Sequence, residues 1–318
     1  MKSSHPLHGL VAAVHTPFNP DGSLNLVVVE QQAAHLLRNG IIIAFIGGTT
    51  GECHSLSLDE RRALARRWSE VARGTALRVS VHVGSNCLAD ARALAAQAQK
   101  LGAISISACA PSYFKPASLD ALIACCADIA TAAPETPFYF YDIPVFTQVS
   151  LSMPDFLEQA PDRIPTLVGL KFTNADLMAY QLCLRTGGGG FDVAYGCDQW
   201  LLAALALGAR GAVGSTYNFA APLYQRMTQA FAAGDLATAR EEQFRSVRLV
   251  QLLSKHGYMG AAKATMALLG VDVGPARIPN GSLPPTQTRQ LRGELETLGF
   301  FDWIQPAARR ENPACHLP

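Results

Sequence analysis

The stretch LVGLKFTNADL, residues 167–177, begins as an apolar run and carries a lysine, Lys171, within its first half. Such a run is typical of a strand that is buried on both faces. A charged side chain is seldom buried without a partner or a task. The partner would be a carboxylate in the core, and the task would be chemistry that needs an amine with a lowered pKa. This stretch alone leaves both alternatives open.

Seven more short apolar runs have the same character, at residues 9–16, 41–48, 77–84, 104–111, 137–144, 191–196 and 211–216. Helix-like segments separate them, and the segment 57–73 opens with a capping-box pattern of Ser57 and Glu60. Eight alternating strand–helix units at this chain length predict an α/β fold, a (β/α)8 TIM barrel. An open doubly wound sheet is the alternative, but it usually has a G-x-G-x-x-G after its first strand, and none occurs here.

The pattern changes near residue 221, after which helical segments follow one another without strands between them. We interpret residues 8–230 as the barrel and residues 231–303 as a C-terminal helical extension. The segment 304–318 is polar and rich in proline, which is typical of a loose tail.

Composition argues against several classes of protein. The chain has 318 residues, of which 49% are hydrophobic, and a formal net charge of +1, so we expect neither a nucleic-acid nor a membrane partner. We find no signal-peptide pattern and no apolar run of the roughly 18 residues that a membrane span needs. The eight cysteines and eight histidines lack zinc-site spacings, so we expect reduced thiols, a cytoplasmic location and no metal.

In a TIM barrel the chemistry lies at the carboxyl ends of the strands. The candidate residues at these ends are Thr49, Thr50, Tyr141, Lys171, Thr173, Gly196, Asp198 and Ser215. Each also has a purely structural interpretation: the threonines as turn residues, the tyrosine as core, the lysine as half of an ion pair, and the aspartate as a helix cap. Their convergence on one rim favours a functional site.

Four motifs together resemble the N-acetylneuraminate lyase / dihydrodipicolinate synthase family of class I aldolases: GGTTGE (47–52), YDIP (141–144), GLKFTNADL (169–177) and GSTYN (214–218). The likeness extends over roughly residues 8–303 and is greatest to the N-acetylneuraminate lyase branch. It implies that Lys171 forms an imine with a 2-keto acid, so that no other cofactor is needed. It implies a carboxylate clamp at Thr49 and Thr50, a proton shuttle at Tyr141 and a homotetramer.

Specificity is where this chain departs from the family pattern. Phe146 stands where the synthases place an arginine that binds a second carboxylate. The lyases also have an apolar residue at this position. Gln199 follows Asp198 where the lyases show an acid that holds sugar hydroxyls, so Gln199→Glu is expected to raise kcat/KM for a sugar acid. Asp142 replaces an expected His or Asn. Tyr113 is a further candidate, either for proton relay or as a packed aromatic.

The function that these features favour is cleavage of N-acetylneuraminate to N-acetylmannosamine and pyruvate. The alternatives are an aldolase or dehydratase for another 2-keto-3-deoxy or hydroxy-keto acid, a dihydrodipicolinate synthase, and a non-catalytic keto-acid-binding protein. In the sugar-acid reading, Thr173, Gly196, Asp198, Gln199 and Ser215 bind the substrate, because hydrogen-bonding groups at one mouth suit a polyhydroxyl chain.

Overall fold

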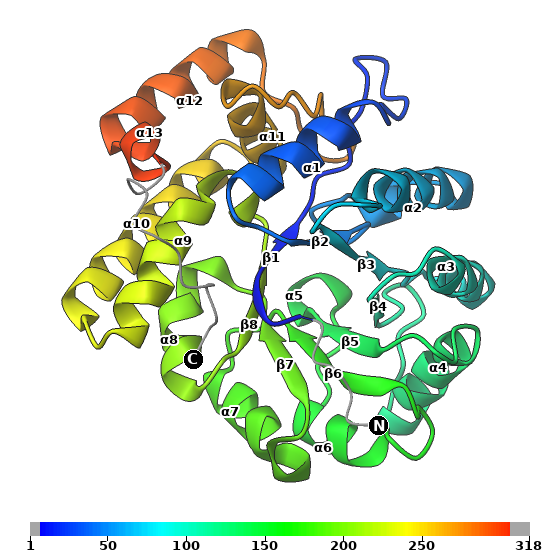
Figure 1. Cartoon of the computed structure of the whole chain (residues 1–318). Coiled ribbons are helices and arrows are strands. Elements are labelled where there is room, and N and C mark those ends of the chain that lie inside the picture. The colour runs from blue at the N-terminus through cyan, green and yellow to red at the C-terminus, as the bar shows by residue number, and fades with distance from the viewer. Residues whose placement is uncertain (1–6, 306–318) are drawn as a thin grey trace.

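Eight parallel strands close into a barrel in the order of the chain, as predicted (Figure 1). The computed structural model describes residues 7–305, so the tail from residue 306 onward lies outside the described residues. The strands are β1 Gly9–Ala13, β2 Ile43–Ile46, β3 Arg78–His82, β4 Ser105–Cys109, β5 Phe138–Asp142, β6 Leu167–Phe172, β7 Asp192–Tyr195 and β8 Gly211–Gly214. Each lies within one of the eight predicted apolar runs.

Both faces of each strand are covered, which is why the strands read as continuous apolar runs. Side chains on one face fill the barrel interior, among them Val11, Phe45, Tyr139 and Val213. Side chains on the other face pack under the surrounding helices. Because residues alternate between the faces, the sequence of a strand also fixes which of its side chains enter the barrel.

Helices form the outer layer between successive strands (Figure 1). They are α1 Val28–Arg38, α2 Leu58–Ala72, α3 Leu88–Lys100, α4 Leu119–Thr131, α6 Met153–Gln159, α7 Leu177–Arg185, α8 Leu201–Leu207 and α9 Tyr217–Ala232. The short helix α5 Pro144–Thr147 lies inside this ring instead (Figure 1). The predicted capping box begins α2: Ser57 accepts from the Glu60 amide while Glu60 accepts from the Ser57 amide. Short 3-10 turns are η1 Cys53–Ser55, η2 Thr186–Gly189 and η3 Asp198–Trp200.

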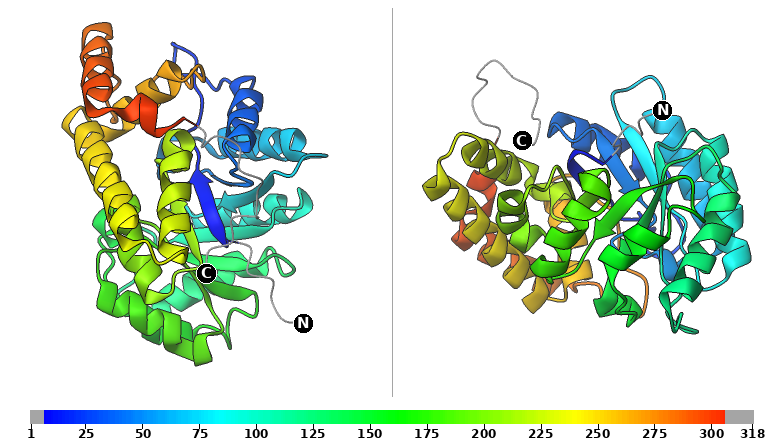
Figure 2. Two further views of the ribbon diagram at one scale, coloured as in Figure 1. Left: turned by 60° about the vertical axis from the view of Figure 1, so that its left-hand side comes forward. Right: turned by 90° about the horizontal axis from the view of Figure 1, so that it is seen from below.

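The chain continues past the barrel as the predicted run of helices, namely α10 Leu236–Lys255, α11 Tyr258–Leu268, α12 Pro285–Leu298 and α13 Phe300–Trp303. Helix α10 packs along α9, and α11 and α12 follow beyond it on the same side of the barrel (Figure 2). The linker between α11 and α12 passes over the barrel mouth, so the extension also contributes to the site described next. Within residues 7–305, no helix has both the length and the apolar character needed to cross a membrane.

Candidate active site

A cavity of about 450 Å³ opens at the carboxyl ends of the strands. Its lining residues come from six strand ends and from the extension: Ala13, Thr49, Thr50, Tyr141, Ile143, Phe146, Lys171, Thr173, Gly196, Val213, Ser215, Gly257, Tyr258, Met259, Pro279, Asn280 and Gly281. The cavity therefore brings together every predicted site residue except Asp198, Gln199 and Tyr113. Residues more than 120 positions apart in the sequence share one wall.

Lys171 points into the barrel, because its neighbours Leu170 and Phe172 both belong to the outer core layer. Its side chain is buried, and its Nζ lies 4.0 Å from the ring centre of Phe45 and 4.1 Å from that of Tyr141. Among residues 7–305, no hydrogen bond or ion pair of this Nζ is found. The structure therefore does not support the ion-pair alternative for Lys171.

Burial in these apolar surroundings lowers the pKa of Lys171 to about 7, and the charge of Asp198 only partly opposes this shift. A lysine in water stays almost fully protonated at neutral pH. Here a large fraction of the amine carries a free electron pair, which is what a nucleophile needs.

Tyr141 lies beside Lys171 on the neighbouring strand β5, directly opposite it in the strand register. Its hydroxyl is 3.2 Å from the Thr49 hydroxyl. Burial raises the pKa of Tyr141, and the nearby hydroxyls of Thr49 and Thr173 oppose the shift. Tyr141 is therefore a neutral phenol that can accept one proton while it passes on another.

The loop after β2 holds Thr49 and Thr50, both half-buried, at the cavity wall. A hydrogen bond holds the loop in place, because the Thr16 hydroxyl donates to the Gly51 carbonyl at 2.7 Å. Glu52 follows in a left-handed conformation, with φ of 55°, and its side chain turns into the core. Hydroxyls on a tight, glycine-flanked turn suit a carboxylate ligand.

Thr173 and Gly196 form a second polar part of the wall. The Thr173 hydroxyl is buried and makes no hydrogen bond within the described part of the chain, so it is available to a ligand. A Cβ at position 196 would lie 1.9 Å from that hydroxyl oxygen. Glycine is therefore required at 196 if Thr173 is to take this position.

Ser215, after β8, is the predicted residue that meets the extension. Its hydroxyl is hydrogen-bonded to the hydroxyl of Tyr258, the first residue of α11. Both line the cavity, so a substrate hydroxyl reaching Ser215 also reaches Tyr258.

Asp198 does not line the cavity, contrary to the expectation that it faces the mouth. It is buried, and its Oδ2 accepts from the Thr216 amide at 2.9 Å and the Thr216 hydroxyl at 2.6 Å. It makes no side-chain cap for η3 either, so the helix-cap alternative is also wrong. Its carboxylate instead contributes negative charge behind Lys171.

The remaining predicted residues lie away from the cavity of this chain. Gln199 is half-buried in η3, and Tyr113 is 78% exposed with its ring against Phe114. Asp142 lies on β5 beside Tyr141, and its carboxylate accepts a hydrogen bond from the side-chain nitrogen of Asn174 at 3.2 Å. Burial raises the pKa of Asp142 to about 6. Phe146, in contrast, lines the cavity as expected and leaves its ring 68% exposed.

Comparison with known proteins places this site in a family. The model of the dihydrodipicolinate synthetase family matches residues 6–298. The chain belongs to the dihydrodipicolinate synthetase family. The family resemblance seen in the sequence motifs is thus confirmed over nearly the whole length.

Several relatives in this family carry the same name. The N-acetylneuraminate lyase of Gallus gallus is 40% identical over 300 residues, which cover 93% of this chain and 97% of that protein. The N-acetylneuraminate lyase B of Xenopus laevis is 45% identical over 238 residues, covering 74% of this chain and 89% of that protein. The solved structure of Proteus mirabilis N-acetylneuraminate lyase superposes with a TM-score of 0.90 at 37% identity, covering 92% of this chain and 99% of that one.

Sequence reasoning about this family member missed the residues that the extension supplies, Tyr258, Met259 and Pro279 to Gly281. One signal was available. Lys263 stands alone in the apolar stretch YMGAAKATMALLG, and Glu52 follows the threonine pair directly. The two form a buried ion pair of 2.7 Å, so a search for the partner of either charge would have brought the extension to the barrel mouth.

Proposed function

We propose that this protein is a class I aldolase that cleaves N-acetylneuraminate to N-acetylmannosamine and pyruvate through an imine on Lys171. The observation that carries the proposal is a buried lysine without an ionic partner, with its pKa lowered to about 7, at the mouth of the barrel. The names of the relatives support this choice of substrate.

The first step joins the Lys171 nitrogen to the C2 ketone carbon of the open-chain substrate. The neutral amine attacks, the ketone oxygen takes one proton from the amine and one from solvent and leaves as water, and a protonated imine remains. The substrate carboxylate beside C2 would be held by the hydroxyls of Thr49 and Thr50, which orients the ketone toward the amine. No charge has to be buried before attack, because the amine enters the step neutral.

The second step breaks the C3–C4 bond. The electron pair of that bond moves toward the iminium nitrogen and leaves an enamine, while the C4 hydroxyl becomes an aldehyde and gives up its proton. Tyr141 would accept this proton on its hydroxyl oxygen and pass its own hydroxyl proton to the Thr49 hydroxyl. Protonation of the enamine at C3 and addition of water at C2 then release pyruvate and restore the amine.

A dihydrodipicolinate synthase is the less favoured alternative because it needs a second carboxylate site. Phe146 offers an apolar ring at the cavity, and no arginine is among the lining residues from the described chain. L-Aspartate semialdehyde should therefore be a poor partner for pyruvate. An aldolase for another hydroxylated keto acid would use the same chemistry at Lys171. It would differ only in the part of the cavity that binds the rest of the substrate.

The test is a panel of 2-keto acids, each supplied to the purified protein with released pyruvate measured by a coupled assay, together with L-aspartate semialdehyde supplied with pyruvate and pyruvate consumption measured. In parallel, borohydride added with pyruvate should leave a reduced three-carbon adduct on Lys171, read by peptide mass spectrometry. N-acetylneuraminate is expected to give the highest kcat/KM. A panel led by aspartate semialdehyde condensation, or an adduct on another lysine, would refute the proposal.

We also propose that the protein is a cytoplasmic homotetramer and works without a metal. Residues 7–305 contain no group of three His, Cys, Asp or Glu side chains arranged to hold a metal ion. Activity should survive exhaustive chelation, and loss that one divalent ion restores would contradict a purely imine-based mechanism. Sedimentation at working concentration should give a tetramer, and a stable monomer would refute that part.

A further inference from the structure

The cavity has a roof that belongs to the extension. Pro279, Asn280 and Gly281 lie in the linker between α11 and α12 and contribute to the cavity wall opposite the strand ends. The linker packs closely on α11, because a Cβ at Gly260 would lie 2.4 Å from the Gly281 carbonyl oxygen. The position of the roof is therefore set by a few specific contacts.

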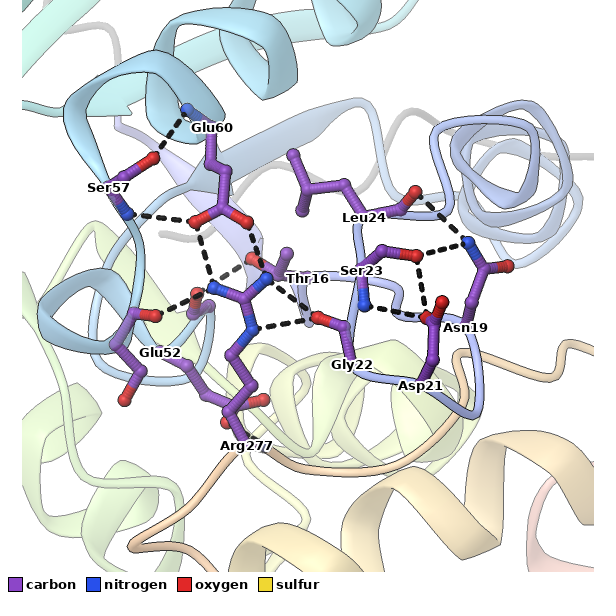
Figure 3. A network of polar contacts seen from close by, with 12 residues as sticks. Thr16, Asn19, Asp21, Gly22, Ser23, Leu24, Glu52, Ser57, Glu60 and Arg277 are labelled. Carbon is purple, nitrogen blue, oxygen red and sulfur yellow. Dashed lines mark hydrogen bonds and ion pairs between the residues drawn. The ribbon is translucent and has the colours of Figure 1, made fainter.

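Arg277 makes the most extensive of these contacts. Its Nε and Nη2 donate to the Gly22 carbonyl at 2.9 and 2.7 Å, and its Nη1 donates to the Ser55 carbonyl at 2.8 Å. Nη1 and Nη2 also donate to the two carboxylate oxygens of Glu60. All five guanidinium N–H groups are thus used, and they tie the linker to the loops after β1 and β2 and to α2 (Figure 3).

The second contact is the buried carboxylate of Glu52. Its Oε2 accepts from the Arg277 amide at 2.8 Å and from the Asn280 side-chain nitrogen at 3.3 Å, while Oε1 pairs with Lys263. Glu52 follows Thr49 and Thr50 after one glycine. One carboxylate therefore links the loop of the two threonines to the amide of the roof.

We propose that Asn280 is a substrate-contacting residue and that Arg277 is the positioning residue that places it. With one N–H given to Glu52, the Asn280 amide keeps its carbonyl oxygen and its second N–H for a ligand. One donor and one acceptor on the same group suit the hydroxyl and acylamino groups of a polyhydroxylated keto acid. The proposal rests on the proposed function, and it concerns the part of the cavity wall that the linker between α11 and α12 contributes.

The experiment compares Asn280→Ala, Arg277→Gln and the double variant, with Arg292→Gln as the matched control. Arg292 is an arginine of the same extension, exposed on α12, with an ion pair to Glu296 at 2.9 Å. Each variant is assayed for KM and kcat on the best substrate of the panel and for borohydride trapping of pyruvate on Lys171. Thermal unfolding identifies any variant that does not fold.

We expect Asn280→Ala and Arg277→Gln each to raise KM about tenfold with kcat changed less than about threefold, as for the loss of a hydrogen bond to substrate. Pyruvate trapping should stay at the wild-type level, since pyruvate lacks the hydroxyl and acylamino groups that Asn280 is proposed to bind. The double variant should match the worse single one, because both changes remove the same contact. Arg292→Gln should match wild type.

An unchanged KM in Asn280→Ala overturns the proposal, and so do multiplied effects in the double variant or a loss of pyruvate trapping. Failure of the proposed function looks different. In that case the wild type traps pyruvate but the panel selects another keto acid, and the variants are then compared on that acid.

Discussion

Two lysines are buried among residues 7–305, one in the barrel and one in the extension, and they differ in their polar partners. Lys263 on α11 forms an ion pair with Glu52, donates hydrogen bonds to the carbonyls of Thr16 and Pro275, and lies 4.3 Å from the ring centre of Phe18. Lys171 on β6 has two aromatic rings next to its amine, and within residues 7–305 no hydrogen bond or ion pair of that amine is found. Burial lowers the pKa of both amines, and a carboxylate opposes each shift, Glu52 by direct pairing at Lys263 and Asp198 by its charge alone at Lys171. The difference separates a lysine that holds two parts of the fold together from one that is available for chemistry.

The largest effect should come from removing each lysine and measuring turnover. Lys171→Ala is expected to lose more than about a thousandfold in kcat and to lose the borohydride adduct, because the nucleophile is gone. Lys263→Met should still form the adduct on Lys171. Turnover that survives in Lys171→Ala, or an adduct found on Lys263, would reverse the roles of the two lysines.

The effects on stability should rank the two lysines in the opposite order to the effects on turnover. Lys263→Met leaves the buried Glu52 carboxylate without its cation, so the free energy of unfolding should fall by about 3–5 kcal/mol. Lys171→Met, the same exchange of side chains, removes an amine without an ionic partner and should keep or raise the free energy of unfolding. Denaturant titration measures both, and Glu52→Gln combined with Lys263→Met should recover part of the loss. Equal losses in the two single variants would remove the distinction.

The pH dependence of imine formation sharpens the comparison further. The neutral amine is the reactive form, so the rate should rise with pH through the lowered pKa of about 7 and level off above it. Between pH 6 and pH 8 this predicts about a tenfold increase in the trapping rate. Asp142→Asn is the control for the other nearby group, whose pKa is raised to about 6. A rate that still climbs steeply above pH 9 would mean that burial does not lower the pKa of Lys171.

The smallest effect should come from Gln199. The sequence pattern suggested that Gln199→Glu would raise kcat/KM for a sugar acid, but Gln199 does not line the cavity of this chain. We expect the substitution to change kcat/KM less than about threefold, because the half-buried side chain does not line the cavity. A tenfold rise in the steady-state assay would restore the original interpretation.

The barrel could be predicted because each strand is buried on both faces and therefore appears in the sequence as a short, continuous apolar run. The side chains that such strands carry into the mouth, Lys171 and Tyr141 above all, follow from the alternation of faces. Asp198 could not be placed in this way. The chain turns into η3 directly after β7, and the direction of a side chain in such a turn depends on its partner, here Thr216.

The roof could not be predicted from local patterns at all. Arg277 and Glu60 are 217 positions apart, and no periodicity relates the linker to the loop after β2. Only charge balance in the core gave a signal, since Glu52 and Lys263 each required a partner. The sequence thus indicated the lining residues at the strand ends, Lys171 and Tyr141 among them, and missed those that the extension contributes.

The rings of Phe45 and Tyr141 next to the Lys171 amine would also act on the proposed reaction intermediate. A proton on the free amine can leave, so burial returns the lysine to its neutral form. The protonated imine that we propose with a keto acid also carries one N–H, and it must keep this proton to draw electrons from the C3–C4 bond. The negative faces of the two aromatic rings would attract this cation. The rings would thus oppose the effect of burial and help to keep the covalent intermediate charged.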